Sequence, residues 1–475
     1  MKKIIICITV LATVSILFSC KDFLLEEPLF SQSNEMTLGK FEGLDNAAAA
    51  LYARFQNYSW YGAAFILSSD LRCGNAKNPN SQPGSGRYRV DPYWTYDVNT
   101  TSALWSYAYY AISWCNNVIN NLDGKESADV TAQQINNLKA EALFVRALCH
   151  FDLVITYAQP YTYEPDGLGV PVVKVTENAL PARNTTREVY AQIVEDLLEA
   201  ETLMSDNYTR ANAKDPFAVA SKPAIQALLS RVYLYMGEWQ NCANYATKVI
   251  NSGRFSLADR ETYLSMWTAT VAARGGEVIF EVFGSTRNSF WDGSGWEQIS
   301  YITNTGANGS ADVCASLDLI ALYEEGDVRG ELFEQDEDDF FTKKYAGKTG
   351  SPIPKENNII LLRLSEMYLN RAEALYNGAT ISGVTAQSDL NAIAEKRGST
   401  PISPSATSIF TERRKELAFE GHIFFDYART KTSLVRNDYS GINNKDVEFP
   451  SYRWAMPIPK RETDANPNMV QNPNY

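Results

Sequence analysis

Apolar residues recur at helical spacing in several stretches of this chain, most clearly in residues 359–378. Their apolar positions cover most of a helical circumference, which predicts a helix enclosed by other helices. Arg363, Glu366, Asn370 and Glu373 follow one another at spacings of three or four residues and form one narrow polar stripe. We expect these groups to pair with charges on neighbouring helices and not to act as catalytic carboxylates.

Helical periodicity also occurs in residues 45–55, 102–122, 133–157 and 186–204. The third of these stretches is apolar nearly all round, so it predicts a buried helix. It contains His150, one of only two histidines in the chain. We expect His150 to be a hydrogen-bonded core residue and not a metal ligand.

Residues 222–251 predict a hairpin of two helices. Small Ser230 is followed by Tyr233 and by Gly237 at the turn, and small residues begin again at Cys242. This spacing is similar to a tetratricopeptide repeat, in which small residues let two helices approach closely. Residues 359–378 and 390–397 are expected to form a second pair of this kind. Residues 254–355 are irregular, with a strand-like run at 277–283.

The first twenty residues have the pattern of an exported lipoprotein. Two lysines precede an apolar run at residues 4–18, which is short for a membrane span and typical of a signal peptide. The run ends in Leu17-Phe18-Ser19-Cys20, which is similar to a bacterial lipobox. We expect residues 1–19 to be removed and Cys20 to be lipidated, with residues 20–40 as a tether. The alternative is an ordinary signal peptide that leaves Cys20 as a free thiol.

Charge and composition exclude several classes of function. The formal net charge is −13 and no basic run occurs, which argues against a nucleic-acid partner. Phosphate-binding loops, dinucleotide fingerprints and the motifs of zinc proteases and serine hydrolases are missing from the sequence. We expect neither a cofactor nor a metal. The acidic run at residues 336–339 lacks the glycine and distal glutamate of a calcium loop. It therefore predicts a solvent-exposed turn. Five cysteines remain after Cys7 and Cys20, without metal-ligand spacing, and indicate no disulfide framework.

Two irregular segments carry aromatic residues without helical spacing. Residues 74–86 are rich in Asn, Ser, Pro and Gly and predict a loop. Tyr93, Trp94 and Tyr96 follow this loop, and a second aromatic group lies within residues 290–301. Loops carry binding residues more often than the elements they connect, so these rings are candidates for a ligand surface. Core packing is an equally good explanation for each ring taken alone.

The sequence of the last third of the chain resembles a known protein family. Residues 361–376, 389–397, 413–429 and 456–475 resemble successive signatures of the SusD/RagB family of outer-membrane nutrient-binding lipoproteins. The resemblance continues through nearly the whole mature chain and implies an all-α fold. In that fold tetratricopeptide-like hairpins form the scaffold, with long irregular loops and a few short strands, in one globular unit.

The resemblance also implies a partner, a location and a division of the chain. The partner is a SusC-like TonB-dependent transporter, on which the lipid-anchored protein sits as a lid at the outer membrane, exposed at the cell surface. Residues 41–475 are expected to form the SusD-like domain, with an N-terminal part at 41–255, a loop-rich ligand face at 256–355 and the signature region at 356–475. By segment, the resemblance places the ligand site at Tyr93, Trp94, Tyr96 and Asn99, with Trp291, Trp296 and Tyr301 opposite and Arg72 or Arg87 nearby.

Three functions remain open from the sequence. The first is capture of oligosaccharides without cleavage, and the second is capture of peptides on the same scaffold. The third is a surface glycoside hydrolase, which needs two carboxylates about 5 Å or about 6.5–9.5 Å apart, one with a raised pKa. Its candidates are Glu420 and Asp426, with His422 between them. In a helix these residues lie on different sectors, so we expect them to stabilise the fold.

Overall fold

The computed structural model describes residues 38–80, 87–99, 103–177, 179–211, 213, 215–270, 276–284, 298–305, 309–351, 356–439, 441 and 443–475. The expected signal peptide and Cys20 therefore lie outside the described residues. The fold is mainly helical, with tetratricopeptide-like hairpins and a few short strands in one globular unit, as predicted.

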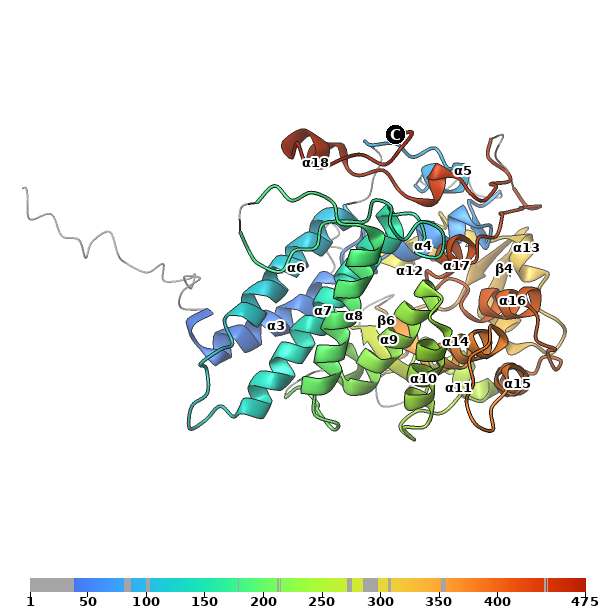
Figure 1. The fold of residues 1–475 in the computed structure, drawn as a ribbon. Coiled ribbons are helices and arrows are strands. Elements are labelled where there is room, and N and C mark those ends of the chain that lie inside the picture. The colour runs from blue at the N-terminus through green and yellow to red at the C-terminus, as the bar shows by residue number, and fades with distance from the viewer. Residues whose placement is uncertain are drawn as a thin grey trace, which may run out of the picture.

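Long helices pack side by side and form the scaffold (Figure 1). Along the layer, α6 contacts α7, α7 contacts α8, α8 contacts α9, α9 contacts α10, and α10 contacts α14. α3 packs against α6 and α7 at one end, and α15 and α16 pack against α14 at the other. The bounds are α3 (Phe41–Arg54), α6 (Leu104–Asn120), α7 (Ala132–Tyr157), α8 (Thr186–Leu203), α9 (Lys222–Met236), α10 (Trp239–Ile250), α14 (Leu364–Tyr376), α15 (Ala386–Arg397) and α16 (Ala406–Glu416).

Shorter elements complete the molecule around this layer. The helices are α4 (Ala64–Arg72), α5 (Val90–Tyr93), α11 (Arg260–Ser265), α12 (Gln298–Thr303), α13 (Leu317–Ile320), α17 (Ile423–Arg429) and α18 (Lys460–Ala465), with 3-10 turns η2 (Pro216–Ala218), η6 (Val328–Leu332) and η7 (Tyr452–Trp454). Among the residues that the structure describes, no helix is both long and apolar enough to cross a membrane.

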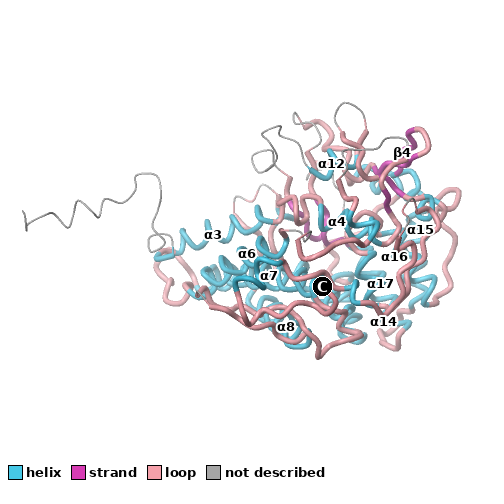
Figure 2. Tube along the Cα trace, turned by 90° about the horizontal axis from the view of Figure 1, so that it is seen from above, coloured by secondary structure: helices cyan, strands magenta, loops and turns pink. Residues whose placement is uncertain are grey.

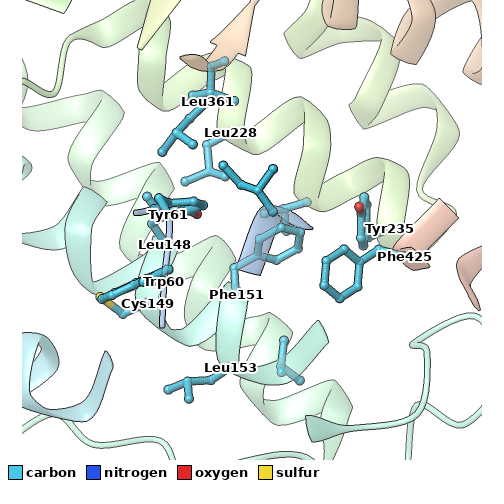
Figure 3. Close-up of a cluster of buried hydrophobic side chains, with 14 of the residues drawn as sticks. Trp60, Tyr61, Leu148, Cys149, Phe151, Leu153, Leu228, Tyr235, Leu361 and Phe425 are labelled. Atoms are coloured by element: carbon cyan, nitrogen blue, oxygen red, sulfur yellow. The ribbon is translucent and has the colours of Figure 1, made fainter. Parts of the chain in front are cut away.

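The buried helix α7 is the centre of the main core. It begins with a capping box in which Thr131 and Gln134 bond each other's backbone N–H groups. Figure 3 shows Phe151 of α7 among side chains from several other segments. His150 is fully buried, its Nδ1 lies 3.1 Å from the carbonyl oxygen of Arg146, and its Nε2 accepts from the Val173 N–H. Burial lowers the pKa of His150 to about 3, so the predicted core role is confirmed.

The predicted hairpin of residues 222–251 is confirmed as α9 and α10. Gly237 ends α9 with φ +73°, a left-handed conformation that glycine adopts without steric cost. Ser230 donates a hydrogen bond of 3.2 Å to the carbonyl oxygen of Cys242, which is possible because both residues are small. Tyr233 and Tyr245 stack with ring centroids 5.7 Å apart. α14 and α15 form the second pair, as expected.

The helix predicted to begin at residue 359 begins five residues later, so that boundary was wrong. The strand β6 (Ile359–Arg363) occupies the first five positions and pairs antiparallel with β2 (Val278–Val282). All ten residues of the two strands are buried. A short apolar run has no period that separates a buried strand from a buried helix, and here the pairing with β2 decides.

The polar stripe of this segment pairs with charges on neighbouring elements, as predicted. Arg363 binds Glu277, Glu416 and Glu420, with the shortest contacts at 2.7 Å. Further along, Glu366 pairs with Arg231 at 2.6 Å. Asn370 accepts from Arg413, and Glu373 pairs with Arg429. The stripe therefore joins helices and does not open into a catalytic site.

A small antiparallel sheet lies beside these helices, with strand order β1 (Ala76–Lys77), β3 (Cys314–Ala315), β5 (Asp339–Thr342) and β4 (Phe333–Asp336). The acidic run at residues 336–339 forms the turn between β4 and β5, as predicted. Its last member, Asp339, is nevertheless buried and lies 3.7 Å from Lys77. The five described cysteines are all buried free thiols. Figure 2 shows loops gathered around α12 and β4.

Candidate functional site

A cluster of tyrosines around one arginine lies at the loop-rich side of the fold. It consists of Tyr58, Arg87, Tyr88, Tyr301 and Asp312, and we call it the arginine–tyrosine cluster. The guanidinium carbon of Arg87 lies 5.6 Å from the ring centroid of Tyr301. The Nη1 atom of Arg87 also lies 3.2 Å from Oδ2 of Asp312. Two residues predicted for the site, Arg87 and Tyr301, are therefore in contact, although they are far apart in the sequence.

Local hydrogen bonds hold this contact in place. Tyr301 belongs to α12, and its carbonyl oxygen accepts from the Ser310 N–H at 2.7 Å. The Ser310 hydroxyl donates to Asp312 at 2.5 Å. Asn78, just after β1, donates to the carbonyl oxygens of both Arg87 and Asp312. The segments that carry the arginine and the tyrosine are thus tied to the same sheet.

Two further tyrosines extend the cluster. The rings of Tyr58 and Tyr88 lie 6.4 Å apart, and both side chains are only partly buried. Tyr88 adopts φ +57°, an uncommon conformation for a residue with a side chain. Partial burial raises the pKa of Tyr58, so its hydroxyl stays protonated at neutral pH. Tyr58 and Asp312 were not predicted: Tyr58 lies close to Trp60 and Tyr61 in the sequence, and Asp312 belongs to no aromatic run.

A second aromatic pair involves another predicted residue. Tyr93, at the end of α5, makes an edge contact with Tyr439 at 6.0 Å. Arg436 lies over the Tyr439 ring at 4.1 Å, and Asn444 donates to the carbonyl oxygen of Tyr93 at 2.8 Å. Tyr93 remains half-buried. The pair combines ring faces with amide and guanidinium groups, although no sequence pattern singles out Tyr439.

The structure places three other predicted residues in the core. Trp94 is 2% exposed, donates from Nε1 to the carbonyl oxygen of Arg72, and packs edge-on against Trp454 at 4.9 Å. Its φ of +54° turns the chain sharply at the end of α5 and directs the indole inward. Tyr96 is 5% exposed and donates to the carbonyl oxygen of Arg453. Arg72 is 8% exposed and pairs with Asp91 at 2.9 Å. These side chains are used for packing.

Three residues predicted for the ligand site remain: one is exposed to solvent, and two lie outside the described part of the chain. Asn99 is exposed, and its backbone N–H donates to Asp97. Trp291 and Trp296 lie outside the described residues. Within the described ranges, no three His, Cys, Asp or Glu side chains lie close enough together to hold a metal ion.

The two carboxylates considered for glycoside hydrolysis are committed to ion pairs. Glu420 binds Arg363 and Lys344, each at 2.7 Å. Burial alone would raise the pKa of Glu420, but these two positive charges outweigh it and hold the pKa below its ordinary value. Asp426 is buried between Arg413 and Arg429, and its pKa is lowered by the same balance. A general acid for glycoside cleavage needs a raised pKa, and neither group has one.

Comparison with known proteins identifies the family. The model of the SusD family matches residues 339–475, and a model described as "Starch-binding associating with outer membrane" matches residues 22–234. A crystal structure of a SusD superfamily protein from Bacteroides vulgatus is 30% identical, with a TM-score of 0.78, covering 92% of this chain and 99% of that one. The chain belongs to the SusD family.

Other SusD relatives extend the comparison over the whole chain. SusD-like protein P2 of Formosa agariphila is 26% identical and matches 98% of this SusD-family chain and 99% of its own length. Surface glycan-binding protein A of Bacteroides thetaiotaomicron, solved in complex with laminarihexaose, shares the fold with a TM-score of 0.73 at 20% identity, covering 92% of this chain and all of that one.

Proposed function

We propose that this SusD-family protein captures oligosaccharides without cleaving them and delivers them to a SusC-like TonB-dependent transporter, on which it sits as a lid. The observation that carries the proposal is the arginine–tyrosine cluster on the loop-rich side of a SusD fold. A surface glycan-binding protein of the same fold holds laminarihexaose, so this fold can present a glycan site.

The chemistry of the cluster suits a sugar. Sugar rings have apolar C–H faces that stack on aromatic rings, and their hydroxyl groups need donors and acceptors at the edge. Tyr58, Tyr88 and Tyr301 supply partly exposed rings, and Arg87 supplies donors while buried Asp312 holds its guanidinium in place. We propose Tyr93 and Asn99 as further contacts, with Trp291 and Trp296 completing the ligand face from the second aromatic segment.

The proposed location follows from the N-terminal sequence. Lipidation of Cys20 would add several acyl chains to one residue, which anchors a protein durably where a single chain does not. Residues 20–40 would then act as the tether between the membrane and the domain that begins at residue 41. The protein would be held beside its transporter at the outer membrane.

A binding experiment tests the glycan site. Protein consisting of residues 21–475 is screened against polysaccharides and peptides by affinity electrophoresis and calorimetry, with reducing ends measured in the same mixtures. We expect one glycan class to bind, Tyr301→Ala and Arg87→Lys to weaken binding at least tenfold, and no new reducing ends to form. Tyr110→Ala serves as the control, since this exposed tyrosine lies on α6.

Other outcomes would redirect the proposal. Binding of peptides alone would favour the peptide-binding alternative, and release of sugar products would refute the non-enzymatic function. Delivery is tested separately in cells, where Cys20→Ala should abolish co-purification with the transporter while the soluble domain still binds its glycan. Unchanged uptake of the glycan by cells that carry Cys20→Ala would contradict the anchored-lid role.

A further inference from the structure

A pocket of about 420 Å³ lies at a distance from the arginine–tyrosine cluster, at the turn of the α9–α10 hairpin. Three aromatic side chains line it: Trp239 from α10, Tyr376 from the end of α14 and Phe410 from α16. Tyr376 is 46% exposed, and Phe410 is fixed by an edge contact with Tyr427 at 4.8 Å. Phe410 therefore presents a fixed ring surface, and Trp239 and Tyr376 add rings from two other helices of the scaffold.

The floor of the pocket is polar but electrically balanced. Glu373 and Arg429 form a two-pronged ion pair with N···O distances of 2.5 and 2.8 Å. Arg429 also binds Asp426, which in turn binds Arg413 at 3.2 Å. Two positive and two negative charges thus cancel, and all four side chains are buried. The floor itself attracts neither an anion nor a cation strongly.

Lys431 at the mouth of the pocket is not balanced in this way. It is exposed and lines the pocket, and its Nζ donates to the carbonyl oxygen of Thr162 at 3.3 Å. Among the residues that the structure describes, no carboxylate lies within ion-pair distance of Lys431. The chain as a whole carries a net charge of −13, so a positive charge at an aromatic pocket differs in sign from the net charge of the protein.

Hydroxyl and amide groups complete the rim. Thr432, which follows Lys431 in the sequence, and Thr407 line the pocket, as does Asn377, which follows Tyr376. The amide nitrogen of Asn377 donates to the carbonyl oxygen of Glu373 at 2.8 Å, which fixes the orientation of that side chain. The pocket therefore offers aromatic faces, neutral hydrogen-bonding groups and one cation at its mouth.

We propose that this pocket binds an acidic sugar, with a uronic acid residue of an oligosaccharide as the ligand. The apolar face of the sugar ring would lie against Trp239 or Tyr376, and its carboxylate would bind Lys431. Threonine and asparagine side chains would bind the remaining hydroxyl groups. The pocket is a second site: Figure 1 shows α5, which follows Arg87 in the sequence, near the top of the molecule and α10 and α14 in its lower half.

The test measures binding of glucuronate and galacturonate oligosaccharides to residues 21–475 by calorimetry and saturation-transfer NMR. Lys431→Gln shortens the side chain only slightly and removes its charge, and we expect it to weaken uronate binding about tenfold or more, because hydrogen bonds to charged groups are the strong ones. Tyr376→Ala should weaken binding similarly. Lys174→Gln removes the charge of another exposed lysine and should change nothing.

The result for the arginine–tyrosine cluster separates the two sites. Arg87→Lys should leave uronate binding unchanged, and Lys431→Gln should leave unchanged the binding of the glycan held by the arginine–tyrosine cluster. Failure of the first site to bind any glycan would refute the proposed function and leave this pocket standing. The pocket proposal is overturned if no saturable uronate binding occurs, if Lys431→Gln has no effect, or if an aromatic peptide competes equally well at this site.

Discussion

Asp152 in the main core is predicted to make the stability of this protein depend on pH. Its Oδ2 accepts hydrogen bonds of 2.7 Å from both Trp60 Nε1 and the Tyr61 hydroxyl, and the side chain is 2% exposed. Burial raises the pKa of Asp152 from 3.8 to about 7, and the two hydrogen bonds offset only part of this effect. The carboxyl is therefore half protonated in the native protein near neutral pH.

The sign of the effect on stability follows from linkage. Below pH 3.8 the carboxyl is protonated in both the folded and the unfolded chain. Between that value and pH 7 only the unfolded chain loses the proton, so the stability falls as the pH rises and stops falling above the folded pKa. Each pH unit corresponds to 1.36 kcal/mol, so ionising Asp152 inside the fold costs about 4 kcal/mol.

The variant Asp152→Asn keeps an oxygen acceptor for Trp60 and Tyr61 and removes the ionisable group. We expect it to be more stable than the wild type at pH 8 by up to about 4 kcal/mol, with the difference shrinking by about 1.4 kcal/mol per unit as the pH falls from the folded pKa of about 7 toward 5. Urea unfolding of residues 21–475, followed by circular dichroism at several pH values, measures this difference.

The control is Asp426→Asn, whose wild-type carboxylate binds Arg413 and Arg429 and has a lowered pKa. This variant should be less stable than the wild type at neutral pH. Parallel stability curves for Asp152→Asn and the wild type between pH 5 and pH 8 would show that the Asp152 carboxyl ionises in the core without cost, and would refute the reasoning.

Three further predictions concern the scaffold. Glu416→Gln removes a carboxylate that binds Arg363, Arg397 and Arg329, and should cost about 3 to 5 kcal/mol because a buried ion pair loses one partner; an unchanged urea midpoint would contradict this. Glu420 has a lowered pKa, so its contribution is present above the ordinary glutamate pKa and is lost as the pH falls through the folded value. The stability gap between wild type and Glu420→Gln should therefore close on acidification, and a constant gap would count against it. Gly237→Ala should cost about 1 kcal/mol from backbone conformation alone, since the nearest atom to a Cβ added at this position would be 3.7 Å away, and an equally stable Ala variant would disprove it.

The helical scaffold could be predicted because its signals are local. α7, α8 and the α9–α10 hairpin each carry their own period, cap or turn residue, so their bounds came within one or two positions. β6 could not be separated from α14 in the same way. Its strand conformation depends on pairing with β2, about eighty positions earlier in the chain, and no local pattern records that pairing.

The candidate site was only partly predictable for a similar reason. A ring in a loop has the same sequence signature whether it faces a ligand or the core. Trp94 turns inward because Trp454 and the carbonyl oxygen of Arg72 receive it, and both belong to distant segments. Tyr439 is the opposite case, since this isolated tyrosine becomes part of an aromatic pair only through the fold.

The segment after residue 455 has a consequence for how this protein assembles. Met456 donates to the carbonyl oxygen of Thr156, and Asn472 donates to the carbonyl oxygen of Tyr157, so residues synthesised three hundred positions later close the end of α7 (Figures 1 and 2). Contacts of such long range form slowly, because a large loop of chain must be ordered before they are gained. The central helix therefore stays open at this end until the late segment arrives. If the chain is exported unfolded, as the proposed signal peptide implies, this end of the core would be completed only after the last residues have arrived.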